Sequence, residues 1–207
     1  MTGAGTMDAT PVIDILRASV AGASVDAVPD AVDMPTIRVD AAHVTDVMRT
    51  LRDHPDLQFA LLAELTAVDL LPAEPRFEIV YHLACLGEAY ATGQPAPRRR
   101  LRVKVGLPGD DPRIATVTTI YPAAGWLERE VYDLFGVAFE GHPDLRRLLT
   151  ADDWTGHPLR KDYPVQVRKA AASWSPIQLT AEEFAENVRA ERAQAAAAAR
   201  EGEPSRD

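Results

Sequence analysis

The chain has 207 residues, of which 46% are hydrophobic and 26% charged, a composition that excludes a wholly disordered or collagen-like protein. Its 22 basic and 31 acidic residues give a formal net charge of −9, which argues against nucleic acid as a partner because phosphate backbones attract a large basic face. A single cysteine, Cys85, excludes an internal disulfide and a metal site built from cysteines of this chain alone.

The ends of the chain and its apolar stretches give no membrane signal. The first ten residues have neither a cationic start nor an apolar core, so we expect no secretory signal and a cytoplasmic protein. The longest apolar stretch, residues 59–71, is interrupted by Glu64 and Asp69 and is shorter than the roughly 20 residues that cross a bilayer.

The first half of the chain predicts a short helix over residues 11–20 and a strand over 34–39. Asp40 is placed to cap a second helix, which ends before Pro55 because the residue preceding a proline avoids helical geometry. The apolar residues of that helix recur at the spacing of one helical face. They are Val44, Val47, Met48 and Leu51.

Three strands are expected next, over residues 59–71, 76–86 and 101–107. The first is ambiguous between strand and helix, whereas the other two alternate apolar and polar side chains. The Gly- and Pro-containing stretch 87–98 predicts a long exposed hairpin loop, so the second and third strands should be antiparallel. Arg98, Arg99 and Arg100 either form a basic docking patch or are a solvated strand edge.

A fourth strand is expected over residues 114–120, followed by a helix that starts at Pro122 and stops at Gly136. Residues 137–164 then mix Pro, Gly, His, Trp and charged residues with little periodicity. Residues 180–201 predict an exposed helix, with Thr180 and Glu183 as its capping box.

These elements predict a two-layer α/β (α+β) fold, in which helices pack on a mostly antiparallel sheet. An extended docking segment and a C-terminal helical tail follow this domain. The expected divisions are residues 1–10 as a flexible N-terminus, 11–136 as the two-layer domain, 137–179 as the docking segment and 180–207 as the Ala-rich tail.

The functional side chains concentrate in residues 128–164, and we find no catalytic arrangement among them. Glu128 and Glu130 are two apart on a helix and point away from each other, so a paired-carboxylate site is not indicated, whereas Arg129 and Asp133 are spaced for a helix ion pair. The chain contains no G-x-G-x-x-G, Walker A or G-x-S-x-G motif. Cys85 is expected in the core.

His142 and His157 raise the alternative of a free-standing zinc hydrolase, with Asp144 or Asp153 as a third ligand. However, 15 residues separate the two histidines, and His-Pro is also a common turn element. A different class of function, docking onto a partner protein, fits the stiff Pro-flanked arginines and aromatics better, because such side chains anchor interfaces. Arg146, Arg147, Arg160 and Lys161 have few obvious partners within the chain, so we expect at least one arginine to pair with a carboxylate of a neighbouring subunit.

Three runs in this segment closely resemble the signature of the C subunit of the proton-translocating NADH-quinone oxidoreductase, respiratory complex I. They are E-R-E-x-Y-D-L-F-G-V-x-F over residues 128–139, H-P-D-L-R-R-L-L over 142–149 and D-W-x-G-H-P-L-R-K-D-Y-P over 153–164. The resemblance extends back to about residue 34 and fades before residue 30 and after residue 165.

The resemblance implies a peripheral-arm subunit with no catalytic, cofactor-binding or metal-binding residues of its own. FMN, iron–sulfur clusters and quinone would lie in partner subunits, chiefly the D subunit, which forms the quinone pocket, and the cluster-bearing B and I subunits. The chain would lie on the cytoplasmic side of the cell membrane, held there only through partners. The alternative within the family is the equivalent subunit of a membrane-bound hydrogenase or another complex I-like oxidoreductase that uses a different electron donor.

The resemblance also supplies candidate residues for contacts between subunits. They are Glu128, Arg129, Glu130, Asp133, His142, Arg146, Arg147, Trp154, His157, Arg160, Lys161, Asp162 and Tyr163.

Overall fold

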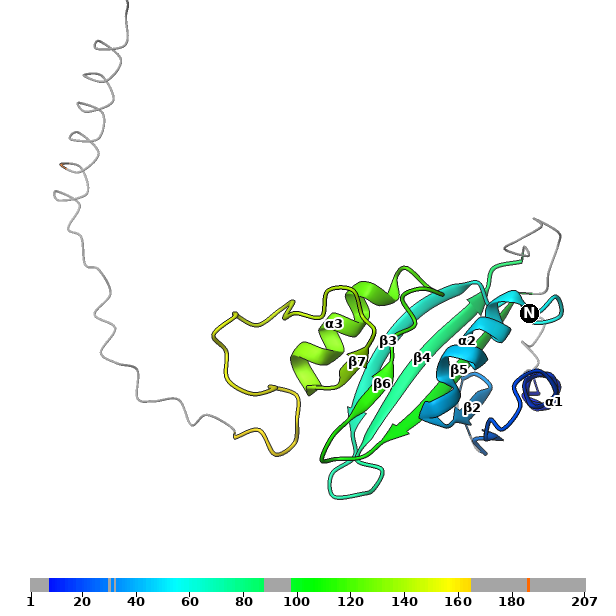
Figure 1. Cartoon of the computed structure of the whole chain (residues 1–207), viewed down its shortest axis with the longest axis horizontal. Coiled ribbons are helices and arrows are strands. Elements are labelled where there is room, and N and C mark those ends of the chain that lie inside the picture. Colours follow the sequence, from blue (N-terminus) through cyan, green and yellow to red (C-terminus); the bar gives the residue numbers. More distant parts are fainter. Residues whose placement is uncertain (1–7, 30, 32, 88–97, 165–185, 187–207) are drawn as a thin grey trace, which may run out of the picture. The chain divides into compact units, whose positions relative to one another are not determined.

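Helices gather on one face of a five-stranded sheet in the computed structural model of the chain, which describes residues 8–29, 31, 33–87, 98–164 and 186 (Figure 1). The strand order is β1-β2-β5-β4-β3; β2 and β5 are parallel and the other neighbours antiparallel. The predicted two-layer α+β fold is therefore confirmed. The strands are β1 (Val25–Ala27), β2 (Thr36–Val39), β3 (Leu61–Asp69), β4 (Phe77–Cys85) and β5 (Arg99–Leu107).

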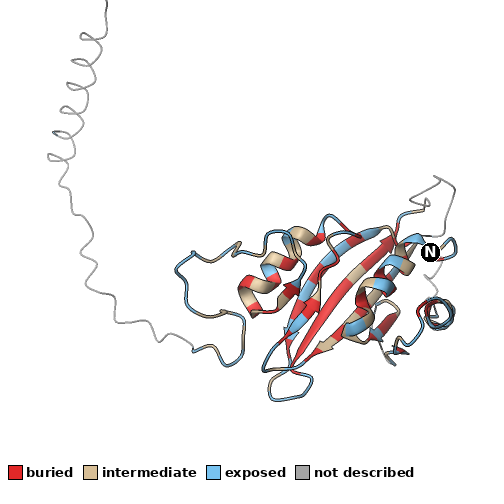
Figure 2. Ribbon diagram, in the orientation of Figure 1, coloured by how far each residue is buried: buried red, intermediate tan, exposed pale blue. Residues whose placement is uncertain are grey.

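Strand β4 is the centre of the core and is buried along almost its whole length (Figure 2). Its register places Tyr81 between Leu65 of β3 and Val103 of β5, and all three side chains are buried. Such apolar cross-strand rows stabilise a sheet because each side chain covers its neighbours. The predicted antiparallel pairing of the second and third strands is confirmed, and the ambiguous stretch 59–71 contains a strand.

Helices α1 (Thr10–Ser19) and α2 (Val44–Asp53) lie in the helical layer, and a 3-10 turn, η1 (Ala41–His43), leads into α2. The predicted apolar face of α2 is buried, and the helix ends before Pro55 as expected. The predicted cap by Asp40 is wrong. Its carboxylate accepts the Ser24 amide at 2.8 Å and contacts His43 Nδ1 at 2.5 Å, so it joins the β1 side of the fold to the turn instead.

Helix α3 (Ala124–Phe135) packs against β3 and is followed by Gly136 in the left-handed region at φ +72, as the sequence predicts. The predicted strand over 114–120 is mostly wrong, since β6 (Arg113–Ala115) stops early and pairs in parallel with β7 (Ala138–Glu140). The chain turns after Ala115 because the buried carboxylate of Glu128 binds the next two residues. This tertiary contact overrides the β propensity of the stretch.

Several sequence predictions fall outside the described residues. They are most of the 87–98 loop, all of the docking segment beyond Pro164, and the 180–201 helix except Glu186. The described residues up to Tyr163 form one compact unit, while the predicted divisions at residues 136 and 179 stay predictions. Among the described residues, no helix combines the length and apolar character needed to cross a membrane.

Candidate docking site

Asp133 organises the loop that follows β7. Its buried carboxylate accepts the amide N–H groups of Leu148, Leu149 and Thr150 at 3.0, 2.7 and 2.8 Å, together with the Thr150 hydroxyl. Burial by itself would raise the pKa of Asp133, but the Thr150 hydroxyl and the backbone amides outweigh it and hold the pKa well below its usual range. The carboxylate is therefore ionised at neutral pH and fixes three consecutive amides of the loop.

Arg147 completes this arrangement from inside the same loop. Its Nη1 donates to Asp133 Oδ1 at 2.8 Å, and its Nη2 donates to the carbonyls of Trp154 and Gly156 at 2.9 and 3.1 Å. One guanidinium thus ties α3 to two turns of the loop, since its donors form a fixed planar fork. The expectation that this arginine has few partners within the chain is wrong.

Two further side chains satisfy the C-terminal end of α3, where backbone carbonyls have no partner inside the helix. Arg160 donates from Nε to Phe135 O at 2.5 Å and from Nη2 to Gly136 O at 3.2 Å. His157 Nδ1 lies 2.9 Å from Asp133 O, so it carries the hydrogen that this carbonyl accepts. Arg160 is also bonded within the chain, which corrects the same expectation for a second arginine.

The approach of these groups requires glycine at position 136. A Cβ there would lie 2.5 Å from both Arg160 Nη2 and His157 Cδ2, and the positive φ already disfavours a side chain.

Burial lowers the pKa of His157, and the charges of Arg160 and Arg147 act in the same direction, so the ring is neutral at pH 7.

A buried arginine anchors the far end of the segment to the sheet. Arg76 makes two bonds with Asp69, at 3.0 and 2.9 Å, and two with Asp162, at 3.0 and 2.7 Å. Asp69 Oδ2 also accepts the Lys161 amide at 2.8 Å. The hydrogen bonds from Arg76 hold the pKa of Asp69 well below its usual range. Sequence reasoning missed Asp69 and Arg76 as partners, because the two lie among other charged residues of the stretches 59–71 and 76–86 and nothing in the sequence sets them apart.

The ring of Phe77 contacts two of these arginines. The guanidinium carbons of Arg76 and Arg160 lie 4.8 and 5.2 Å from the centre of the Phe77 ring. Cation–π contacts of this kind favour arginine over lysine because the guanidinium is planar and weakly hydrated. Residues 157–163 are thus held to both α3 and β4.

Glu128 organises the opposite end of α3. Its wholly buried carboxylate accepts the Val117 amide at 2.8 Å and contacts the Thr116 hydroxyl at 2.5 Å. Burial raises the pKa of Glu128 to about 7, although both bonds act against the shift. The ring of His142 lies beside it, with Nε2 4.0 Å from Glu128 Oε2 and 3.0 Å from the carbonyl of Gly125.

The predicted ion pair between Arg129 and Asp133 is wrong. Arg129 instead donates to the carbonyls of Arg146 and Arg147 at 3.1 and 3.0 Å, and its guanidinium carbon lies 5.1 Å from the centre of the Trp126 ring. The carboxylate of Asp133 binds Arg147 and backbone amides of the loop instead. Both Arg129 and Asp133 therefore make more hydrogen bonds than they would make with each other. The helix spacing permitted the pair, but tertiary contacts decided against it.

The candidate residues fall into three groups, one of which is partly buried and consists of Arg129, Arg147, His157, Arg160 and Tyr163. Glu128, Asp133 and the ring of His142 are internal and hold the segment in shape, whereas other candidates remain exposed. The exposed candidates are Glu130, Arg146, Trp154, Lys161 and Asp162. Large exposed apolar side chains accompany them, namely Trp126, Leu149 and Leu159, which are 63%, 62% and 52% exposed.

The described residues contain no group of three His, Cys, Asp or Glu side chains arranged to hold a metal ion. His142 and His157 bind carbonyls near opposite ends of α3, at Gly125 and Asp133, so the proposed zinc pair does not converge. Cys85 is buried in the core, as expected.

Comparison with known proteins gives consistent matches. A family model described as the 30 Kd subunit of respiratory-chain NADH dehydrogenase matches residues 37–169. A relative from Geobacter sulfurreducens, named as the C subunit of NADH-quinone oxidoreductase, is 48% identical over 63% of this chain and 75% of its own length. A relative of the same name from Roseiflexus sp. (strain RS-1) is 37% identical over 84% of this chain and 95% of its own length.

Two solved structures resemble the chain. One is a trypsin-resistant fragment of Nqo5, with a TM-score of 0.50, 34% identity, and coverage of 67% of this chain and 100% of the fragment. The other belongs to the membrane-bound sulfane sulfur reductase, an archaeal respiratory membrane complex, with a TM-score of 0.59, 30% identity, and coverage of 76% of this chain and 85% of that chain.

Proposed function

We propose, because the chain belongs to the family of the 30 Kd subunit of respiratory-chain NADH dehydrogenase, that it is the non-catalytic peripheral-arm subunit of a proton-translocating NADH-quinone oxidoreductase. Electrons pass from NADH through FMN and iron–sulfur clusters of partner subunits to quinone. This chain binds none of these groups and supports the partners that do.

The observation that supports the proposal is the way in which the 137–163 segment is held in place. Buried charges and carbonyl contacts fix its backbone from within the chain, and this leaves apolar and cationic side chains facing outward. A segment that is already ordered loses little conformational entropy on docking. Trp154, Arg146 and Lys161 are the side chains of this surface that we assign to contacts with a neighbouring subunit.

The partners that fit this assignment are the D subunit, which forms the quinone pocket, and the cluster-bearing B and I subunits. This chain lies on the cytoplasmic side of the cell membrane. This chain reaches the membrane only through its partners, because its net charge of −9 opposes direct binding to anionic lipids.

The test is purification of the tagged full chain from its own host after gentle detergent extraction. We expect FMN, iron–sulfur clusters and NADH-quinone reductase activity to copurify with the tag, whereas the chain alone has no flavin or cluster absorbance. Recovery of the tagged chain as a free protein from membranes with active NADH-quinone reductase would contradict the proposal.

A second candidate follows from the likeness to the sulfane sulfur reductase complex. In this alternative the chain serves a related complex, such as a membrane-bound hydrogenase, in which another donor replaces NADH. The same purification separates the two, because the alternative yields a complex with clusters but without an FMN-containing NADH-oxidising module.

A further inference from the structure

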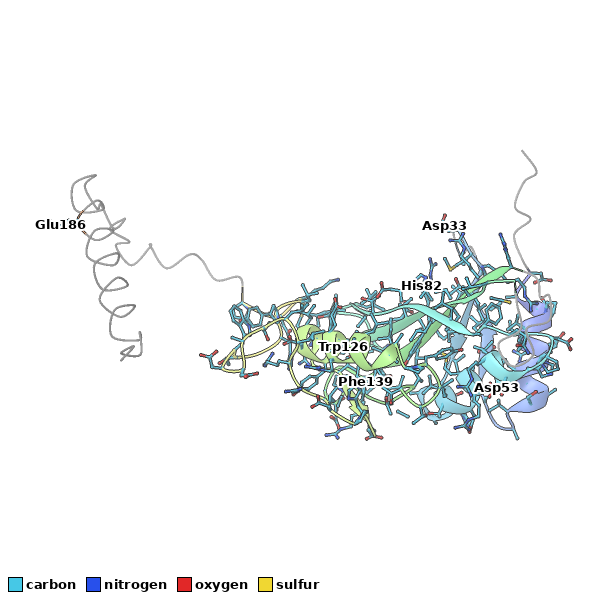
Figure 3. The ribbon with its side chains drawn as sticks, turned by 90° about the horizontal axis from the view of Figure 1, so that it is seen from above. Asp33, Asp53, His82, Trp126, Phe139 and Glu186 are labelled. Atoms are coloured by element: carbon cyan, nitrogen blue, oxygen red, sulfur yellow. The ribbon has the colours of Figure 1, made fainter. Side chains whose placement is uncertain are left out.

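One face of the five-stranded sheet has no helix over it within the described part of the chain. Figure 3 shows His82 of β4 on the opposite side from Asp53 of α2 and Phe139 of β7. Alternation along the strands places every second residue on this side. We call it the open sheet face, and its members by register are Thr36, Arg38, Leu61, Glu64, Thr66, Val68, Glu78, Val80, His82, Ala84, Arg100, Arg102 and Lys104.

One part of the open sheet face is neutralised internally. The carboxylate of Glu78 lies between two cations, with Lys104 Nζ at 2.6 Å and Arg38 Nη2 at 3.2 Å. Glu78 is 7% exposed, so these cations already have a well-buried partner. This part of the face needs no further anion.

The other part of the face holds two arginines in a different situation. Arg100 and Arg102 make no side-chain hydrogen bond or ion pair within the described residues. Arg99, which precedes Arg100 in sequence, faces the other way and donates to the carbonyls of Asp56 and Leu57 at 2.5 and 2.7 Å. The 98–100 arginine run is therefore split, and the basic patch consists of alternate residues of β5.

The register places one carboxylate, that of Glu64, near these arginines, and it forms no ion pair with either of them. His82 lies beside Arg102 and next to Glu64, whose Oε1 accepts the amide of Leu65 at 3.2 Å. Burial and then the charge of Arg102 lower the pKa of His82, with Arg100 acting in the same direction and Glu64 against it. Two arginine charges therefore outweigh one carboxylate in this part of the face, on a chain whose net charge is −9.

Apolar side chains border the two arginines. Ala84 and Val80 are buried among their neighbours, and Leu61, which pairs with Ala84, is 38% exposed. Polybasic lipid-binding patches use clusters of roughly four to eight cations, so two arginines with apolar neighbours fit a protein surface better than a membrane. Arginine with apolar side chains is the composition of a protein interface.

We propose that the open sheet face docks an acidic segment of a partner subunit, whose carboxylates pair with Arg100 and Arg102. The proposal rests on the proposed function, because it takes the chain to work inside a larger complex. Residues two apart in a strand are separated by roughly 7 Å, so an extended partner segment with two carboxylates at the same spacing matches both guanidinium groups. The contact is distinct from the docking surface of residues 137–163.

The experiment uses the assembled complex purified from its host through the tagged full chain. A photo-cross-linking amino acid replaces Thr66, an exposed residue of the open sheet face, and the cross-linked peptide is identified by mass spectrometry. The cross-link is then measured in the double variant Arg100→Glu/Arg102→Glu and in the milder Arg100→Gln/Arg102→Gln, which removes both charges without reversing them and serves as the test if the first variant fails to fold. The matched control is Arg49→Glu/Arg113→Glu, an equal charge change at exposed residues elsewhere.

We expect a peptide of a partner subunit that contains at least two carboxylates. The yield of this cross-link should fall roughly tenfold or more in the glutamate variant, by less in the glutamine variant, and by little in the control. A cross-link to lipid, a partner peptide without carboxylates, no cross-link, or equal yield in all variants overturns the proposal. If the wild-type chain brings down no FMN or cluster-bearing subunits, the proposed function fails instead, so the two failures are distinguishable.

Discussion

Replacing Asp133 by asparagine should release the loop that the carboxylate organises. Oδ2 accepts three backbone amides, while Oδ1 accepts Arg147 and the Thr150 hydroxyl. Asparagine keeps one acceptor oxygen and places an NH2 group opposite donors at the other position, so several donors lose their partner. Arg147 also loses the negative charge that compensates its burial.

The expected cost follows from these contacts. Breaking a buried ion pair costs about 3 to 5 kcal/mol, and hydrogen bonds to charged groups contribute about 1.5 to 3 kcal/mol each without adding fully. We therefore expect Asp133→Asn to lower the free energy of unfolding by about 4 kcal/mol, or the melting temperature by roughly 10 °C. The matched control is Glu130→Gln, which removes an exposed carboxylate of the same helix and should cost less than about 0.5 kcal/mol.

The assay is urea unfolding of the purified full chain, followed by tryptophan fluorescence at neutral and acidic pH. The pKa of Asp133 lies below its ordinary value of 3.8 in the folded chain, so its stabilisation is present at neutral pH and is lost as the pH falls below about 4. The variant should lack this part of the acid destabilisation. A loss of less than about 1 kcal/mol, or one equal to that of the control, would refute the role of Asp133 as organiser of the loop.

Three further predictions concern the ends of α3 and the outward surface. The pKa of Glu128 is about 7 in the folded chain and 4.5 in the unfolded chain, so its contribution to the free energy of unfolding is full at low pH and falls by about 3 kcal/mol as the pH rises through 7. Denaturant unfolding of Glu128→Gln at several pH values should not show this loss. Gly136→Ala should cost about 2 kcal/mol or more in denaturant unfolding, because its Cβ meets Arg160 and His157 at positive φ; a neutral result would show that both side chains move aside freely. Trp154→Ala should leave thermal melting of the isolated chain almost unchanged but reduce recovery of the assembled peripheral arm roughly tenfold, and normal assembly would remove Trp154 from the interface.

The sequence alone determined the helical layer and the central hairpin. The buried face of α2 depends on periodicity, the stop of α3 at Gly136 on glycine at a positive φ, and the antiparallel pairing of β4 with β5 on the Gly- and Pro-containing loop that joins them. The first two are fixed by residues a few positions apart, and the third joins strands that are consecutive along the chain. The signature of residues 128–164 identified the family for a different reason, since its spacings are specific to that family.

Only the tertiary structure decided the partners of the charged side chains. Arg129 and Asp133 have the spacing of an ion pair, yet one binds carbonyls and the other binds amides of the loop. Arg76 joins Asp69 to Asp162, residues far apart in sequence. A charged side chain binds backbone donors and acceptors that have no partner in secondary structure. Helix ends and loop turns contain many such donors and acceptors. The packing of the helices on the sheet decides which of these backbone groups a given side chain can reach. The spacing of residues along the chain therefore does not predict its partners.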